Sequence, residues 1–119
     1  MKVLYLNQEE KEIIRLAIEN NRSAQQKIYV QFSSKMLSVC RQYVKDIHQA
    51  EDIMITAFMK VFTNLKNFQH NGSFEGWIRR IMVNECISHI RVQNKVSFIE
   101  DENYLEESFN NIESQFSVD

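Results

Sequence analysis

The chain contains no proline and only two glycines, Gly72 and Gly76, which lie four residues apart. Proline ends helices and glycine supplies the conformations of tight turns, so this scarcity favours helices joined by few sharp turns. At 119 residues the chain is long enough for one domain with a core of about three to five helices. We therefore predict an all-α fold, a compact bundle of about three to four helices.

Capping signals divide the chain into four predicted helices. The segments NQEE at 7–10 and SAQQ at 23–26 have the spacing of a capping box, in which a polar side chain and a residue three positions later satisfy exposed backbone groups. Asp46 and Ser73 are suited to cap two further helices. The predicted helices cover about residues 7–19, 23–44, 46–66 and 74–95.

Apolar side chains recur at three- and four-residue steps in the three longer helices and predict faces that pack on a core. The second helix contributes Ile28, Phe32, Met36, Val39 and Tyr43. The third contributes Ile47, Ala50, Met54, Ala57, Phe58, Val61, Phe62 and Leu65. The fourth contributes Ile78, Met82, Val83, Cys86, Ile87 and Ile90.

The fourth predicted helix also has a polar face of unusual composition. Its members fall in one narrow arc: Trp77, Arg80, Asn84, Ser88, Arg91 and Lys95. The arc contains three cations and the only tryptophan, and it contains no acid. Base stacking, phosphate pairing and base-edge hydrogen bonding need these groups, so the arc indicates nucleic-acid binding. The alternative is a solvated basic face with the tryptophan tucked under a loop.

The third predicted helix has a second candidate surface opposite its core face. Asp52, Thr56, Met59 and Thr63 follow each other at steps of four, three and four, and Ile55 lies at the edge of this stripe. A methionine in an otherwise polar stripe is typical of a docking surface for a partner helix. A solvated face with one stray methionine explains the pattern equally well.

The polar segment at 67–73 connects these two helices and includes Asn71-Gly72, a turn signal. Phe68, Phe74 and Trp77 bracket this loop, so they place aromatic faces where an unstacked base would lie. The alternative is that such aromatics anchor the loop in the core, and we expect this role for Phe74.

Charge divides the chain unevenly. All 14 Lys and Arg residues lie within residues 1–95, together with 9 of the 16 acids, which gives a net charge of +5. Residues 96–119 contain the other 7 acids and no Lys or Arg, which gives −7. We therefore predict a polyanion-binding domain over 1–95 and an acidic linker over 96–119, partly disordered or a short helix.

The sequence favours neither catalysis nor a bound metal or cofactor. Glu85 and His89 lie four apart without a matching pair on another helix, and a di-metal bundle needs repeated Glu-x-x-His pairs. No phosphate-binding glycine-rich loop occurs. Cys40 and Cys86 are expected as two free thiols in a reducing cytoplasm. Neither a membrane-spanning segment nor a signal peptide is expected.

Two stretches together resemble a known family. The segments AEDIMITAFMKVFTNLKNF and GSFEGWIRRIMVNECISHIR closely resemble the second conserved region of bacterial extracytoplasmic-function (ECF) sigma factors. The resemblance covers about residues 23–95. It includes the Ala-Glu-Asp opening, the Gly-Trp-Ile-Arg-Arg-Ile run and the order of Asn84 and Arg91.

The resemblance implies a cytoplasmic transcription initiation factor that is not an enzyme. Its partners would be RNA polymerase core, through the coiled coil of the largest subunit, and the non-template single strand of promoter DNA. An anti-sigma factor is a further candidate partner. The implied polymerase-binding residues are Asp52, Ile53, Ile55, Thr56, Phe58 and Met59. The implied DNA-binding residues are Phe68, Trp77, Arg80, Asn84, Ser88, Arg91 and Lys95.

The sequence departs from the family pattern in two ways. Ile55-Thr56 stands where the family usually has a polar pair such as Gln-Glu, so the implied docking surface is more apolar. Family members continue into a helix-turn-helix domain, so we expect this chain to be a fragment. A helical protein-binding regulator without DNA binding is the alternative function, and a metal-dependent helical enzyme is a third.

Overall fold

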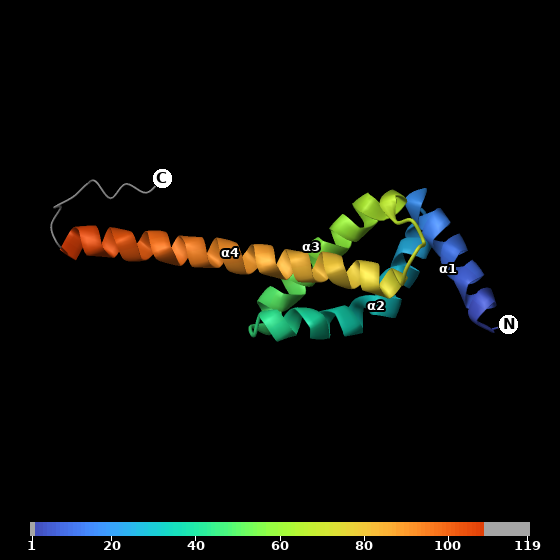
Figure 1. The fold of residues 1–119 in the computed structure, drawn as a ribbon, viewed down its shortest axis with the longest axis horizontal. Helices are drawn as coiled ribbons and strands as arrows, with labels where there is room; N and C mark the ends of the chain where they lie inside the picture. The colour runs from blue at the N-terminus through green and yellow to red at the C-terminus, as the bar shows by residue number, and fades with distance from the viewer. Residues whose placement is uncertain (1, 109–119) are drawn as a thin grey trace. The chain divides into compact units, whose positions relative to one another are not determined.

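The computed structural model describes residues 2–108, with side chains described over 8–97 and at Ile99. These residues form four α-helices and no strand (Figure 1). The helices are α1 (Lys2–Ile18), α2 (Arg22–Tyr43), α3 (Ile47–Asn64) and α4 (Phe74–Ser108), and the 3-10 turn η1 (Leu65–Asn67) follows α3. The predicted all-α class is therefore confirmed.

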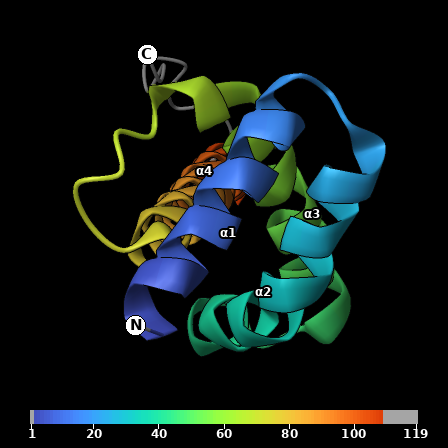
Figure 2. The same cartoon turned by 90° about the vertical axis from the view of Figure 1, so that its right-hand side faces the viewer.

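The chain divides between Cys86 and Ile87 into two compact units, and α4 runs through the division. The first unit contains α1, α2, α3, η1 and the first turns of α4. Within it α2 packs against both α1 and α3, and α1 also packs against η1 (Figure 2). The second unit contains the remainder of α4.

The core of the first unit receives side chains from every one of its helices. Met36, Ala57, Val61, Ile78 and Met82 are completely buried. The predicted core residues Phe32, Met54, Phe58 and Cys86 are buried as well, whereas Phe62 is only half-buried. The periodicity of α2, α3 and α4 therefore predicted most of the core correctly.

Two predicted core residues were wrong, and one contributing helix was missed. Tyr43 and Ile47 are each 41% exposed, and both lie at the corner between α2 and α3. Ile14 and Ala17 of α1 are each only 1% exposed. No core role was predicted for α1, yet it covers one side of α2.

The predicted caps are confirmed at two helices and wrong at two. The Asp46 carboxylate accepts hydrogen bonds from the backbone N–H groups of His48 and Gln49 at the start of α3. At α2 the cap is Asn21, whose side chain accepts from the N–H of Ala24 at 2.9 Å, and the predicted cap Ser23 lies inside the helix.

α1 begins at Lys2, so the predicted cap Asn7 also lies inside a helix. Asparagine is a residue type that commonly caps helices, but Asn7 does not stand at the start of one, because the helix already begins five residues earlier.

α4 extends beyond its predicted end near Lys95 and continues to Ser108. No glycine or proline follows Gly76, so no residue of the kind that commonly ends helices is present to stop it. The charge boundary at Lys95 is therefore not the end of a helix. The assignment of 96–119 as an acidic linker stays a prediction, and 109–119 lie outside the described residues.

Candidate nucleic-acid interface

Three aromatic side chains form a cluster where η1, the connecting loop and the start of α4 meet. The ring centroid of Phe68 lies 5.1 Å from that of Phe74 and 5.2 Å from that of Trp77. Phe74 and Trp77 are stacked, with an interplanar angle of 15°. Phe68 and Phe74 are buried, at 8% and 3% exposure, whereas Trp77 is half-buried. Trp77 is therefore the member of the cluster that offers a ring face to a ligand.

The DNA-binding role of Phe68 stays a prediction: its ring is 8% exposed, and it is one of the residues that line the cavity described below. The Phe68 ring packs against the Trp77 ring, and because it is buried it offers little surface of its own for a base to stack on. Phe74 is the core anchor that we expected, and its ring also meets Phe32 of α2 edge-on at 5.6 Å. The cluster thus fixes the tryptophan to the core.

A cavity of about 400 Å³ lies beside this cluster. Its wall includes the side chains of Asn67, Gln69, Asn71, Trp77 and Arg80, and the backbone of Gly76. The volume is within the range of about 300–1,000 Å³ for small-ligand sites. Amides that donate and accept hydrogen bonds, an aromatic face and a cation are the groups that an unstacked base and its phosphate need.

The loop that forms this cavity is fixed by hydrogen bonds where it enters α4. Ser73 caps α4 as predicted, because its hydroxyl oxygen accepts from the N–H of Gly76 at 3.0 Å and its carbonyl oxygen accepts from the N–H of Trp77 at 3.0 Å. The left-handed residue of the loop is His70, with φ of 58°, and neither glycine has positive φ. The His70 ring lies 4.7 Å from that of Phe68.

α1 also borders the loop. Partial burial raises the pKa of the Glu10 carboxyl, and the charge of the nearby His70 opposes that rise. The sequence did not indicate this pairing, because Glu10 and His70 lie on distant parts of the chain.

Arg80 and Asn84, one turn apart on α4, are both exposed. Among the described residues, no carboxylate oxygen lies within the 4.0 Å of an ion pair from Arg80. Its neighbour Arg79 instead pairs with Glu75 at 3.7 Å, and Glu75 also pairs with Lys35 of α2 at 3.3 Å. The two adjacent arginines therefore differ, and Arg80 is the one that is available to a phosphate.

The other predicted DNA-binding residues belong to the second unit. Ser88, Arg91 and Lys95 are exposed and follow each other along α4 at steps of three and four. They therefore share one face of that part of the helix, as the helical spacing predicts.

α3 presents the second candidate surface, and only part of the predicted set lies on it. Asp52, Ile55, Thr56 and Met59 are exposed, with Ile55 at 47% and Met59 at 64%.

Ile53 and Phe58 were included in the implied polymerase-binding set, but the structure places them in the core. Their exposed fractions are 6% and 2%, because both point toward the interior of the bundle. Ile53 and Phe58 therefore pack in the core under the exposed residues of α3 and are not part of the exposed surface.

An ion pair that the sequence did not indicate joins α3 to α4. The Lys60 Nζ lies 2.6 Å from a carboxylate oxygen of Glu85, and the Glu85 side chain is 18% exposed. The partners lie 25 positions apart, so no helical spacing relates them. Glu85 is the residue after Asn84, so the pair neutralises an acid next to the candidate nucleic-acid surface.

The two cysteines are buried and reduced. Burial, together with the neighbouring Cys86 thiol, raises the pKa of the Cys40 thiol to about 12. Burial also raises the pKa of Cys86. Thiols with raised pKa are poor nucleophiles and poor metal ligands at neutral pH, so these two serve packing.

The described part of the chain has neither a metal-binding cluster nor a membrane-spanning helix. No group of three or more His, Cys, Asp or Glu side chains there is arranged to hold a metal ion. None of the described helices combines the length and hydropathy needed to cross a membrane.

Comparison with known proteins gives consistent similarities. The model of the family "Sigma-70 region 2" matches residues 28–96, which is more than half of the chain. Over 71 residues the chain is 30% identical to the ECF RNA polymerase sigma factor SigW of Bacillus subtilis, a match that covers 60% of this chain and 38% of the relative. Over 76 residues it is 34% identical to a probable RNA polymerase sigma factor of Haemophilus influenzae, with 61% and 39% covered.

The chain therefore spans about two fifths of the length of these curated relatives. Among solved structures, it resembles an engineered region 2 of sigmaE, determined by NMR in complex with GTAAAA. The TM-score is 0.65 at 24% identity, and the match covers 70% of this chain and 86% of that one. This likeness shows a shared fold.

Proposed function

Because the chain belongs to the sigma-70 region 2 family, as a region-two domain of the ECF group, we propose that it acts in transcription initiation. In this proposal α3 docks on RNA polymerase core, and the cavity beside Trp77 holds a base of the non-template promoter strand. The observation that carries the proposal is that cavity, lined by amides, the half-buried Trp77 and Arg80, which has no acidic partner among the described residues.

The side chains around the cavity have complementary roles in this proposal. The exposed face of Trp77 stacks on an unpaired base, and the amides of Asn67, Gln69 and Asn71 meet its polar edge. Arg80 pairs with the adjoining phosphate, and Asn84, one turn further along α4, contacts the next nucleotide. Ser88, Arg91 and Lys95 bind the backbone further along the DNA.

The free energies of base stacking and base extrusion limit what the isolated domain can do to DNA. Stacking an aromatic side chain on a base is worth about 1–3 kcal/mol. Extruding a base from a duplex costs a few kcal/mol. The two terms nearly cancel, so the isolated chain captures an opened strand but does not melt closed promoter DNA.

The exposed residues of α3 support the polymerase-docking part of the proposal. Ile55 and Met59 form an apolar strip with Asp52 at its N-terminal end, which suits a partner helix that buries its own apolar side chains there. We assign this strip to the coiled coil of the largest core subunit. The domain then works in the cytoplasm as a binding module without catalysis, and an anti-sigma factor that covers the strip would inhibit it.

The DNA part of the proposal is testable with matched arginine variants. We expect the 119-residue chain to bind a single-stranded oligonucleotide containing GTAAAA more tightly than the same sequence as a duplex, measured by fluorescence anisotropy at fixed salt. Trp77→Ala should weaken single-strand binding about tenfold, since stacking on an aromatic side chain is worth about 1–3 kcal/mol. Arg80→Ala should weaken it by a similar factor, since a hydrogen bond to a charged group is worth about 1.5–3 kcal/mol.

Arg79→Ala is the control, because Arg79 carries the same charge one position away but is paired with Glu75. Its affinity should stay close to that of the unaltered chain. Equal affinity for duplex and single strand, or equal losses for Arg79→Ala and Arg80→Ala, would contradict the capture site. No DNA binding at all, with polymerase binding retained, would favour a protein-binding regulator.

A further inference from the structure

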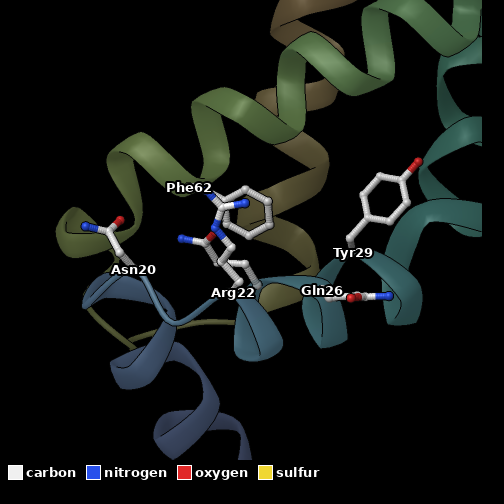
Figure 3. Close-up of a pocket in the computed structure, with 6 residues that line it drawn as sticks. Asn20, Arg22, Gln26, Tyr29 and Phe62 are labelled. Atoms are coloured by element: carbon white, nitrogen blue, oxygen red, sulfur yellow. The ribbon is translucent and has the colours of Figure 1, made fainter.

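A second cavity, of about 540 Å³, lies at the corner between α1 and α2, against the C-terminal half of α3 (Figure 3). It is lined by Asn20, Arg22, Gln25, Gln26, Tyr29 and Phe62. None of these residues belongs to the nucleic-acid surface or to the predicted polymerase-binding set. The cavity combines an aromatic floor, amides and one cation.

The corner that carries two of these residues is rigidly built. Asn20 adopts a left-handed conformation with φ of 68°, which asparagine tolerates better than most residues. The N–H of Asn20 donates to the carbonyl of Ala17, and the N–H of Asn21 donates to that of Leu16, each at 3.0 Å. These two bonds form a Schellman motif, which ends α1 and fixes the start of α2.

A side-chain hydrogen bond fixes a third lining residue. The Gln25 amide donates to the carbonyl oxygen of Ala17 at 3.1 Å. Gln25 is therefore held in place before any ligand arrives, which lowers the entropy cost of binding at this part of the wall.

The floor of the cavity is a chain of packed rings. Phe62 is stacked on the buried Phe58 with centroids 6.2 Å apart, and Phe58 meets Tyr29 edge-on at 5.0 Å. Phe62 is only half-buried, although it is a large apolar side chain on a helix of the bundle. One part of its surface thus faces the cavity and has no covering side chain there.

Of the described residues that line the cavity, only Arg22 is charged. It is exposed, and among the described residues no carboxylate oxygen lies within the 4.0 Å of an ion pair from its guanidinium. Other cations of the first unit, such as Arg15, Lys35 and Lys60, have acidic partners. An acidic group from outside would therefore meet an unneutralised arginine above an aromatic surface.

The cavity also continues the proposed docking strip. Ile55, Met59 and Phe62 follow at steps of four and three along α3, so they lie in line on one side of the helix. Asp52 begins this line, and Phe62 with the cavity ends it. Asp52 and Phe62 are ten residues apart, which is about 15 Å along the helix axis.

We propose that this cavity receives an acidic side chain from the same polymerase-core helix that docks on α3. The carboxylate pairs with Arg22, and the methylene stem of a glutamate packs on Phe62. The inference rests on the proposed polymerase docking and adds a second anchor point and a direction to it. A partner helix with a basic group over Asp52 and an acidic group about 15 Å further on binds in one orientation only.

The test measures the affinity of the 119-residue chain for purified RNA polymerase core enzyme by biolayer interferometry. Arg22→Glu should weaken binding more than tenfold and Arg22→Ala less, because reversal adds repulsion to the loss of the pair. Lys27→Glu, with the same change of charge on an exposed residue of α2 outside the cavity, should change affinity less than about twofold.

Folding is controlled independently of binding. Arg22 is the first residue of α2, where a glutamate is favourable to the helix, so Arg22→Glu should melt at or above the temperature of the unaltered chain. Phe62→Ala provides a second variant and should also weaken binding while Arg22 remains present.

The outcomes separate this inference from the function on which it rests. If Arg22→Glu and Lys27→Glu both bind like the unaltered chain while Asp52→Lys with Met59→Glu does not bind, the cavity is not an anchor site and polymerase docking stands. If the unaltered chain does not bind core enzyme, polymerase docking itself is wrong, and the inference is overturned with it. A loss confined to Arg22→Glu and Phe62→Ala, with Lys27→Glu unaffected, supports the second anchor.

Discussion

On α3, a residue in the core can directly precede one on the exposed surface that we propose for docking. Phe58 is 2% exposed and joins Tyr29 to Phe62, whereas the next residue, Met59, is 64% exposed. A step of one residue rotates the side chain by about 100° around the helix, which is enough to move it from core to solvent. A substitution at either position therefore tests one role almost in isolation.

Phe58→Ala should lower the free energy of unfolding by about 3–5 kcal/mol, because it leaves a cavity among packed rings. Urea denaturation followed by circular dichroism measures this loss. Met59→Ala is the control and should change stability by less than about 0.5 kcal/mol, as an exposed position does. A loss below about 1 kcal/mol for Phe58→Ala would mean that the ring is not packed as the structure shows.

At the scale of whole elements, α3 and the first turns of α4 each have a buried core face and an exposed face that we propose for binding. The two helices are joined by the Lys60–Glu85 ion pair at 2.6 Å, which lies beside both proposed surfaces. Lys60 follows Met59 and Glu85 follows Asn84, so the pair lies between the proposed docking strip and the proposed DNA-binding face of α4. It is a direct link between the two proposed activities.

The docking strip is expected to be sensitive to charge. Asp52→Lys combined with Met59→Glu should lower the affinity for RNA polymerase core by several kcal/mol, because it places like and desolvated charges in the interface. The melting temperature should hardly change, since both positions are exposed. A pull-down with core enzyme measures the effect.

Val30→Glu is the matched control for Met59→Glu. Val30 is 64% exposed, as Met59 is, but belongs to α2 and not to the strip on α3. Binding that survives the double change, with the chain still folded, would rule out the assignment of α3 as the docking helix.

At the scale of the whole molecule, the distribution of charge is the main feature. Residues 1–95 have a net charge of +5 and residues 96–119 a net charge of −7. The first acids of the second group lie in α4 itself, since this helix continues to Ser108. One continuous helix thus holds both the candidate DNA-binding cations and a run of acids.

Neutralising these acids should strengthen DNA binding. We expect Glu100→Gln, Asp101→Asn and Glu102→Gln together to raise the affinity for single-stranded DNA at low salt, because they remove negative charge that repels phosphates. The gain should shrink in physiological salt, where the Debye length is about 8 Å. Fluorescence anisotropy across a salt series provides the measurement.

The control for this variant removes the same charge elsewhere. Glu9 and Glu12 lie on α1 and Glu19 directly follows it, and Glu9→Gln, Glu12→Gln and Glu19→Gln together also remove three negative charges. They should have a smaller effect at low salt. Identical salt dependence for both triple variants would show that only the net charge matters, and not its position on α4.

Much of this architecture was predictable from local sequence. The scarcity of Gly and Pro predicted the helices, and three- and four-residue spacing predicted which sides of α2, α3 and α4 are buried. The arc of Trp77, Arg80 and Asn84 was predictable for the same reason, since helical geometry relates residues a few positions apart. Asp46 and Ser73 were found as caps because capping is a local hydrogen bond.

Only the tertiary structure decided which neighbours cover those faces. It buried Ile53 and Phe68, left Tyr43 and Ile47 exposed, and brought α1 into the core. Local spacing gives the direction of a side chain around its own helix, but burial also depends on whether another helix lies opposite.

The same reason explains the features that no sequence pattern indicated. The Lys60–Glu85 pair and the cavity between the α1–α2 corner and Phe62 each join residues from distant segments. Such contacts form only when helices pack together. Because their residues are far apart in the sequence, no local pattern predicts them. The sequence by itself therefore determined the helical class and the buried faces of α2, α3 and α4, and packing determined the role of α1 and the cavities and ion pairs from which the proposed sites are built.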